Sequence, residues 1–227
     1  MLAVERAAYL IIDDGPAEDF MEKVNDLNAK GIRAIWFCLG EALERFSEEA
    51  VRAIKDGHII GNRSYDDADL SALSLKEVRE QLERTDRIVD GLYTRAGVSR
   101  PSKLFRFPYV HHETDEGHFA GIQRVLEELG YEQPEFENIR CNKRSQAALN
   151  KGLHVECTLD TFDLGTDAAF GDEGGLQAFS GNEIIMIHDW VPAVPFKALM
   201  DKLLMKGMSF KLPKEMSGNM VPVLTST

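Results

Sequence analysis

The sequence predicts an α/β fold built on a parallel sheet, organised as one domain over residues 1–227. Short apolar runs alternate with stretches of helical periodicity along nearly the whole chain. Strands joined by helices pair in parallel, so this pattern fits both a β/α barrel and an open, doubly wound sheet. The 227 residues suffice for one large domain, and no linker rich in proline, glycine or serine divides them.

The apolar runs are short and bounded by glycine, proline or polar residues, which is typical of buried strands in a parallel sheet. Six or seven such strands are expected, with helices between most of them. The predicted strands are residues 7–12, 34–39, 58–61, 103–106, 153–159, 183–187 and 209–212.

Helix boundaries are indicated by capping residues. Pro16 with Glu18 indicates a first turn, and Gly31 a stop. Ser74 and Glu77 form a capping-box pattern ahead of a long apolar stripe. Helices are predicted for residues 16–31, 47–57, 75–92, 115–129, 142–151 and 196–205.

The composition is that of a soluble globular protein with an acidic balance. Lys and Arg number 26 against 38 Asp and Glu, which leaves a net charge of −12. This charge disfavours nucleic acid and anionic membranes as partners, and it suits a neutral or cationic substrate. No apolar run approaches the roughly 18 residues of a transmembrane helix.

The cysteines do not indicate a disulfide framework or a zinc ribbon, and the first residues do not indicate a signal peptide. Cys38, Cys141 and Cys157 are odd in number and form no Cys-x-x-Cys pair, so a disulfide framework or zinc ribbon is not expected. Residues 1–6 lack the basic and apolar regions of a signal peptide. A cytoplasmic location is therefore predicted, or the cell envelope or a secreted location if a leader was removed.

Polar residues follow most of the predicted strands, at the points where the strands end. In a β/α fold the carboxyl ends of the strands open onto one face, where sites are built. An aspartate after a strand is often only the N-cap of the next helix, but five polar groups together favour a functional site. The motifs are Ile12-Asp13-Asp14-Gly15-Pro16, Gly57-His58-Ile59-Ile60-Gly61-Asn62 with Ser64-Tyr65, Arg106-Phe107-Pro108-Tyr109, Asp160 with Asp163, and Ile187-His188-Asp189.

In this order and spacing, the five motifs resemble those of the polysaccharide deacetylase (NodB-homology) family, and the closing Gly207 to Leu212 is similar to that family's end. The resemblance covers roughly residues 7–216. It implies an irregular parallel β/α barrel of about seven strands. It also implies hydrolysis of an N-acetyl or O-acetyl group on a sugar or oligosaccharide, helped by a divalent metal ion.

Deacetylation needs an activated water, an electrophile for the carbonyl oxygen and an acid for the leaving nitrogen. The resemblance assigns the base to Asp13, a metal ligand to Asp14, and the residue that orients the base to Arg106. It implies that the backbone N–H of Tyr109 helps to hold the oxyanion. His188 is implied to be the general acid.

The remaining implied residues support the acid and shape the pocket. Asp163 is expected beside His188, where a carboxylate favours the imidazolium. Pro108 and Ile187 are implied to line the substrate pocket. His154 opens a predicted strand and is expected to lie at the opposite end of the barrel.

The chain departs from the family at the metal site, which the family completes with His-x-x-x-His. These two positions are Arg63 and Asp67. Arginine stays protonated and cannot ligate a cation, so Asp14 and Asp67 are the only ligand candidates left from the set. Two carboxylates and one guanidinium leave one negative charge, and we expect Arg63 to pair with Asp14, Asp67 or both. The expected cofactor is none, or a weakly bound divalent ion resembling zinc.

Three functions remain open at this point. A hydrolase on the deacetylase scaffold is favoured, either with a rebuilt metal site or with Arg63 polarising the carbonyl. His111 and His112 follow Tyr109 and are the candidates for rebuilding that site. The alternative is a catalytically impaired pseudoenzyme that binds carbohydrate, and the third is an unrelated amide hydrolase on the same fold.

Overall fold

The computed structural model describes residues 6–109, 115–139, 152–161 and 181–217. Its strands form a parallel sheet in the order β3-β2-β1-β5-β4, and β6 pairs with the first residues of β1. The predicted parallel α/β architecture is therefore confirmed. The strands are β1 (Arg6–Gly15), β2 (Ala34–Cys38), β3 (Ile59–Asn62), β4 (Leu159–Asp160), β5 (Glu183–His188) and β6 (Met208–Phe210).

Backbone contacts continue the sheet past β3 and join it to β4, as in a barrel. Asn62 at the end of β3 forms a parallel bridge with Phe105. The carbonyl of Phe105 accepts from the N–H of Val155 at 2.9 Å, and the N–H of Thr158 donates to Ile184 of β5 at 2.9 Å. Six strands lie within the described residues, and the implied count of about seven stays a prediction.

The two faces of β1 are both buried, which explains why it is an unbroken apolar run. Tyr9 and Ile11 lie in a cluster with residues from the other strands of the ring, including Ile35, Ile59 and Ile184. The alternate residues of β1 pack against the surrounding helices, because side chains alternate across a strand. The members of this outer cluster from β1 are Ala8, Leu10 and Ile12.

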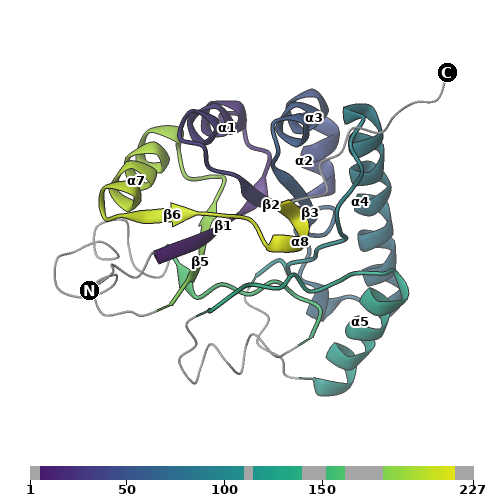
Figure 1. The fold of residues 1–227 in the computed structure, drawn as a ribbon. Coiled ribbons are helices and arrows are strands. Elements are labelled where there is room, and N and C mark those ends of the chain that lie inside the picture. The colour runs from purple at the N-terminus through teal and green to yellow at the C-terminus, as the bar shows by residue number, and fades with distance from the viewer. Residues whose placement is uncertain (1–5, 110–114, 140–151, 162–180, 218–227) are drawn as a thin grey trace.

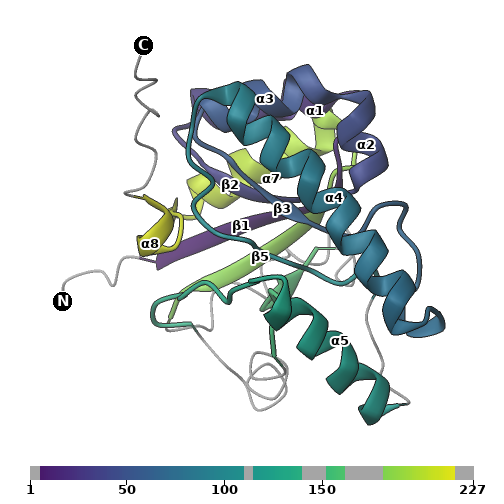
Figure 2. The same cartoon turned by 90° about the vertical axis from the view of Figure 1, so that its right-hand side faces the viewer.

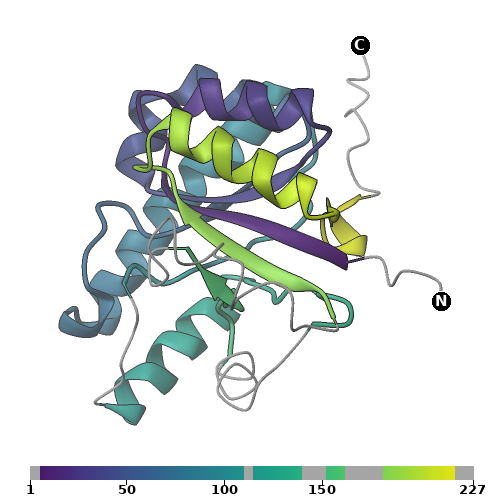
Figure 3. The same cartoon turned by 90° about the vertical axis from the view of Figure 1, so that its left-hand side faces the viewer.

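The helices surround the strands on the outside. Figure 1 shows α7, α1, α3, α4 and α5 in an arc around the sheet, and Figures 2 and 3 show α1 beside α7 on its outer face. Within the part of the chain that the structure describes, no helix has both the length and the apolar character to cross a membrane. The helices are α1 (Phe20–Ala29), α2 (Gly40–Arg45), α3 (Ser47–Lys55), the 3-10 turn η1 (Leu70–Ala72), α4 (Leu75–Ala96), α5 (Glu116–Glu128), α7 (Ala193–Met205) and α8 (Lys214–Ser217).

The long helix α4 begins and ends at the predicted signals. The Ser74 side chain accepts from the N–H of Glu77, and the Glu77 carboxylate accepts from the N–H of Ser74 at 2.8 Å, which completes the capping box. Gly97 closes the helix with φ 69°, a conformation that glycine adopts without a steric penalty. The helix extends to Ala96, four residues beyond its predicted end.

Other elements differ from the predictions. The run at 103–106 forms only the bridge at Phe105, and the run at 153–159 is a strand only from Leu159 onward. The carbonyl of Val155 accepts from the side chain of Arg106 rather than from a neighbouring strand, so a polar side chain interrupts the ladder there. Helix α2 was not predicted, because six residues are too short for a clear helical period. The predicted helix at 142–151 lies outside the described residues.

Candidate active site

The polar residues of the first and last motifs meet at one edge of the sheet. Asp13 on β1 is directly opposite His188 on β5 in the parallel register. Asp14 follows at a bulge, where the register with β2 shifts, and it has φ 65°. A bulge re-aims a side chain, so two consecutive aspartates reach the same site instead of opposite faces. The prediction that Asp13 and His188 lie at the same end of the strands is confirmed.

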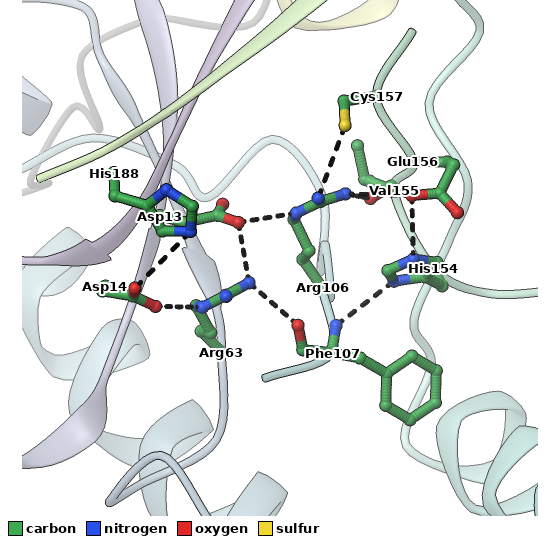
Figure 4. Close-up of polar contacts among 10 residues, drawn as sticks. All are labelled: Asp13, Asp14, Arg63, Arg106, Phe107, His154, Val155, Glu156, Cys157 and His188. Atoms are coloured by element: carbon green, nitrogen blue, oxygen red, sulfur yellow. Dashed lines mark hydrogen bonds and ion pairs between the residues drawn. The ribbon is translucent and has the colours of Figure 1, made fainter. Parts of the chain in front are cut away.

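Asp13 is fully buried and lies between two guanidinium groups (Figure 4). Its Oδ2 is 2.7 Å from Nε of Arg106 and 2.8 Å from Nη1 of Arg63. Its Oδ1 is also buried, and it has no hydrogen-bond partner among the described residues. One oxygen is therefore held by two cations, while the other is left to accept a proton or a hydrogen bond.

Arg63 links both aspartates of the first motif. Its Nε donates to Oδ1 of Asp14, the predicted ion pair, and its Nη1 donates to the carbonyl of Phe107 at 2.8 Å. Its second carboxylate is Asp13, whereas Asp67 was the expected alternative. The side chain of Arg63 is 6% exposed, so the guanidinium is enclosed by the groups that it binds.

Asp67 lies near Asp14 and Arg63, but it is not the second carboxylate that Arg63 binds. Burial and the charge of Asp14 raise the pKa of Asp67, partly offset by Arg63 and by a hydrogen bond from the Tyr109 hydroxyl. A carboxylate with a raised pKa is less well stabilised than one in a tight ion pair. The charge of Arg63 is therefore balanced mainly by Asp13 and Asp14, and less by Asp67.

Arg106 is held at every nitrogen of its guanidinium. Besides Asp13, it donates to the carbonyl of Val155, lies 3.5 Å from the Glu156 carboxylate and contacts the Cys157 sulfur at 3.6 Å. Burial opposes its charge, but Asp13 and Glu156 outweigh burial and raise the pKa of Arg106. Arg106 is therefore fixed beside Asp13, and its implied role in orienting Asp13 stays a prediction.

His154 belongs to the same network, and its expected place at the opposite end of the barrel was wrong. Its Nδ1 accepts from the N–H of Phe107 at 3.2 Å, and its Nε2 is 3.5 Å from the Glu156 carboxylate. Burial lowers the pKa of His154, so the ring is neutral with its proton on Nε2, directed at Glu156. Residues 152–158 form no strand, so the strand geometry that the prediction assumed does not apply to His154.

His188 lies on the other side of Asp14. Its Nε2 is 3.9 Å from Oδ2 of Asp14, and its ring stacks on that of Trp190 with centroids 5.0 Å apart. Its side chain is 15% exposed, so it borders solvent at the mouth of the site. Asp163, the predicted partner of His188, lies outside the described residues, as do His111 and His112.

The predicted pocket residues are also near the cluster in the sequence. Pro108 is buried next to Tyr109 in the chain, whereas Ile187 is buried in the outer cluster with Ile12, so the predicted place of Ile187 in the substrate pocket is not supported. Tyr109 is 60% exposed and has φ 59°. Residues in this region cost backbone strain, and strain of this kind clusters at functional sites. Five non-glycine residues have positive φ among those described, and four belong to the motifs or their loops: Asp14, Ser64, Asp67 and Tyr109.

A second buried ion pair, not predicted from sequence, ties the strand ends together. Lys23 of α1 is fully buried, and its Nζ is 2.7 Å from both Asp189 and Asp19. The N–H of Asp189 donates to the carbonyl of Asp13 at 2.8 Å. The sequence does contain an indication of this pair. Lys23 falls on the apolar, buried face of α1 together with Phe20, where a charged residue needs a buried partner.

The residues present do not fit the divalent metal of the family. Asp14, the implied ligand, is bound by the guanidinium of Arg63, which a cation would have to displace or tolerate at like charge. No group of three or more metal-ligating side chains occurs in the described ranges. No step of the chemistry is therefore assigned to a metal ion.

Comparisons with known proteins agree with the motifs. A model of the polysaccharide deacetylase family matches residues 3–134. A peptidoglycan-N-acetylglucosamine deacetylase from Bacillus cereus is 36% identical over 101 residues, which are 44% of this chain and 35% of that protein. The match thus spans only about a third of that relative's length.

The fold agrees with solved structures. A family 4 carbohydrate esterase from Streptomyces lividans, in complex with acetate, has a TM-score of 0.67 at 21% identity and covers 96% of this chain and 98% of its own. A CE4 family pseudoenzyme from Bacillus anthracis has a TM-score of 0.62 at 15% identity, with 91% of this chain and 63% of its own covered. The chain belongs to the polysaccharide deacetylase family.

Proposed function

We propose that this chain is a carbohydrate deacetylase-type hydrolase that removes an N-acetyl or O-acetyl group from a sugar, with Arg63 at the position of the family's metal. The observation that carries this proposal is the convergence of two carboxylates, two guanidinium groups and an imidazole at one edge of the sheet (Figure 4). These groups belong to Asp13, Asp14, Arg63, Arg106 and His188. These groups include a base, cations and an acid, which are what hydrolysis of an amide or ester requires.

The geometry suggests how the groups share the reaction. Arg106 and Arg63 hold Oδ2 of Asp13, so Oδ1 is the oxygen that takes the proton from the attacking water. The oxygen of the acetyl carbonyl gains negative charge as the water adds, and the Arg63 guanidinium and the backbone N–H of Tyr109 stabilise it. His188 then donates a proton to the leaving nitrogen or oxygen as the bond to the acetyl carbon breaks.

The substrate class follows from charge and from a relative. The net charge of −12 disfavours polyanionic chains and nucleic acids. The relative from Bacillus cereus is named for deacetylation of N-acetylglucosamine in peptidoglycan. An acetylated amino sugar in an oligosaccharide is therefore the proposed substrate, and a cytoplasmic location stays a prediction.

A second candidate function is a carbohydrate-binding pseudoenzyme. One observation favours it: the guanidinium of Arg63 binds both Asp13 and Asp14. A guanidinium whose charge is already shared by two carboxylates stabilises a further negative charge on the acetyl oxygen less well. In this case the fold and the pocket would be retained for binding without hydrolysis.

The test is acetate release from penta-N-acetyl-chitopentaose and from purified peptidoglycan, with and without EDTA. The hydrolase proposal expects release that EDTA leaves unchanged and that Asp13→Asn removes. Binding of the oligosaccharide without any acetate release supports the pseudoenzyme instead. Release that EDTA abolishes would show that a metal ion works beside Arg63.

A further inference from the structure

Two exposed aromatic side chains border the candidate site. Among the described residues, five large hydrophobic side chains are exposed, and the aromatic ones are Tyr109 and Trp190, at 60% and 53% exposure. The Tyr109 hydroxyl donates to Asp67, and the Trp190 ring stacks on that of His188. Both exposed aromatic side chains therefore contact residues of the candidate site.

Trp190 has a defined orientation. Its ring is nearly parallel to that of His188, with an interplanar angle of 25° and centroids 5.0 Å apart. One face of the indole covers the imidazole, and about half of the side chain is still open to solvent. An aromatic ring stacked on the proposed proton donor presents its other face as an apolar plane next to the site.

The segment that carries Trp190 is anchored on both sides. Asp189 is fully buried and binds Lys23 and the N–H of Ala17, the latter at 2.6 Å. The N–H of Val191 donates to the carbonyl of His188 at 3.1 Å, which forms a turn around Trp190. A ring held by its backbone loses little freedom when a ligand binds, which favours affinity.

A pyranose ring has the complementary shape. Its axial C–H groups form a flat apolar face, and the face of an aromatic ring is electron-rich and attracts such polarised hydrogens. Because His188 covers one face of the indole, a sugar would stack on the other face, and only substituents that extend past the edge of the indole would come beside His188. An acetamido nitrogen needs to be there, since His188 is the proposed donor of its proton.

We propose that the open face of Trp190 is the platform on which a pyranose ring of the acetylated oligosaccharide stacks, with its acetyl-bearing substituent extending past the edge of the indole toward His188. This inference rests on the proposed function for the substrate class, but it concerns binding and does not require hydrolysis. Tyr109 borders the site next to Asp67 and gives the same surface a second aromatic side chain.

Calorimetric titration with penta-N-acetyl-chitopentaose tests this role on the full chain. Trp190→Ala should weaken binding about tenfold, which corresponds to about 1.4 kcal/mol and lies within the range of aromatic contacts. Trp190→Phe keeps an aromatic plane and should stay within about threefold of the parent. Met205→Ala removes another exposed apolar side chain at the far end of α7 and should bind like the parent.

Tryptophan fluorescence supplies a second reading. The chain has two tryptophans, and Trp36 is buried in the core, where its N–H donates to His58. A saturable change in emission on adding the oligosaccharide therefore reports on Trp190. It should disappear in Trp190→Phe, while circular dichroism confirms that each variant is folded.

The outcomes separate this inference from the proposed function. Binding that is lost in Trp190→Ala, in a protein that releases no acetate, supports the platform and contradicts the hydrolase. Equal affinity of the parent and Trp190→Ala overturns the platform, whatever the activity. Absence of any binding of the oligosaccharide by the parent also overturns it.

Discussion

Two buried charge clusters lie at the ends of β1 and β5, and they differ in how completely their polar atoms are used. In the first, Asp189 binds Lys23 through Oδ1 at 2.7 Å and the N–H of Ala17 through Oδ2 at 2.6 Å. In the second, Asp13 binds Arg63 and Arg106 through Oδ2, but its buried Oδ1 has no partner among the described residues.

This difference distinguishes a cluster that stabilises the fold from a cluster that can take part in a reaction. A fully paired cluster fixes the chain, because every buried polar atom already has its hydrogen bond. Burial raises the pKa of Asp189, partly offset by Lys23, so that lysine is what keeps the carboxylate charged. A cluster with an unpaired oxygen can accept a proton from a ligand or water, which is the property that a general base needs.

The largest expected effect is on stability, from removal of the cation in the fully paired cluster. Lys23→Met keeps the length of the side chain but leaves Asp189 buried without its partner, and should cost about 3–5 kcal/mol of unfolding free energy. Lys197→Met, which removes a partly exposed pair with Glu22, is the matched control and should cost less than about 1 kcal/mol. Urea unfolding at neutral pH measures both. Similar losses in the two variants would show that the buried pair is not a structural anchor.

Removal of the proposed base, Asp13, from the cluster with the unpaired oxygen should lower activity. Asp13→Asn keeps the shape but cannot take a proton, so kcat/KM for acetate release should fall by about a hundredfold or more. Asp66→Asn changes an exposed carboxylate in the loop that carries Arg63, and should leave kcat/KM within about twofold of the parent. A parent that is active and an Asp13→Asn variant that retains its rate would remove Asp13 from the mechanism.

A smaller effect, on the pH dependence of stability, is expected at His58, which lies apart from both clusters. It is buried, its Nδ1 accepts from Trp36 at 3.2 Å and from the N–H of Ala34, and burial lowers its pKa to about 3. In the unfolded chain an imidazole has a pKa of about 6.5, so the neutral buried ring adds stability at neutral pH that is lost as pH falls from about 6.5 toward 3.

The check is urea unfolding of the parent and of His58→Asn at pH 7 and pH 5. The variant should be less stable at pH 7 by about 1–3 kcal/mol, because donors lose a well-placed acceptor. It should also lose less stability than the parent on acidification. Equal slopes in the two proteins would mean that other groups, such as His154, cause the pH dependence.

Much of the site could be predicted, because its residues directly follow apolar runs and their order carries a family resemblance. Asp13 and His188 lie in register as the strand pattern required. The pairing of Arg63 with Asp13 was not predictable, since it depends on the path of a long side chain and on the carbonyl of Phe107 that anchors it. Lys23 was missed because the sequence shows a helix stripe but not which buried partner it meets.

The fold was predictable at the level of its parallel strands and less so at its irregular parts. The runs at 103–106 and 153–159 are apolar enough for strands, but Arg106 draws the Val155 carbonyl out of the ladder. Such exchange between side-chain and backbone hydrogen bonds is a tertiary effect with no local pattern. The same exchange brings His154 to the site instead of the opposite end.

The proposed function depends most on Arg63, whose guanidinium is proposed to take the place of the family's metal ion. The direct measurement is zinc bound per chain in the parent and in the Arg63→His, Asp67→His double variant, with acetate release measured on the same samples. An aspartate and two histidines four residues apart suit catalytic zinc, and His tolerates the positive φ of Asp67 better than most residues. We predict little zinc and EDTA-resistant release in the parent, and about one zinc and faster release in the double variant. Tight zinc binding by the parent, with activity that EDTA abolishes, would contradict the account.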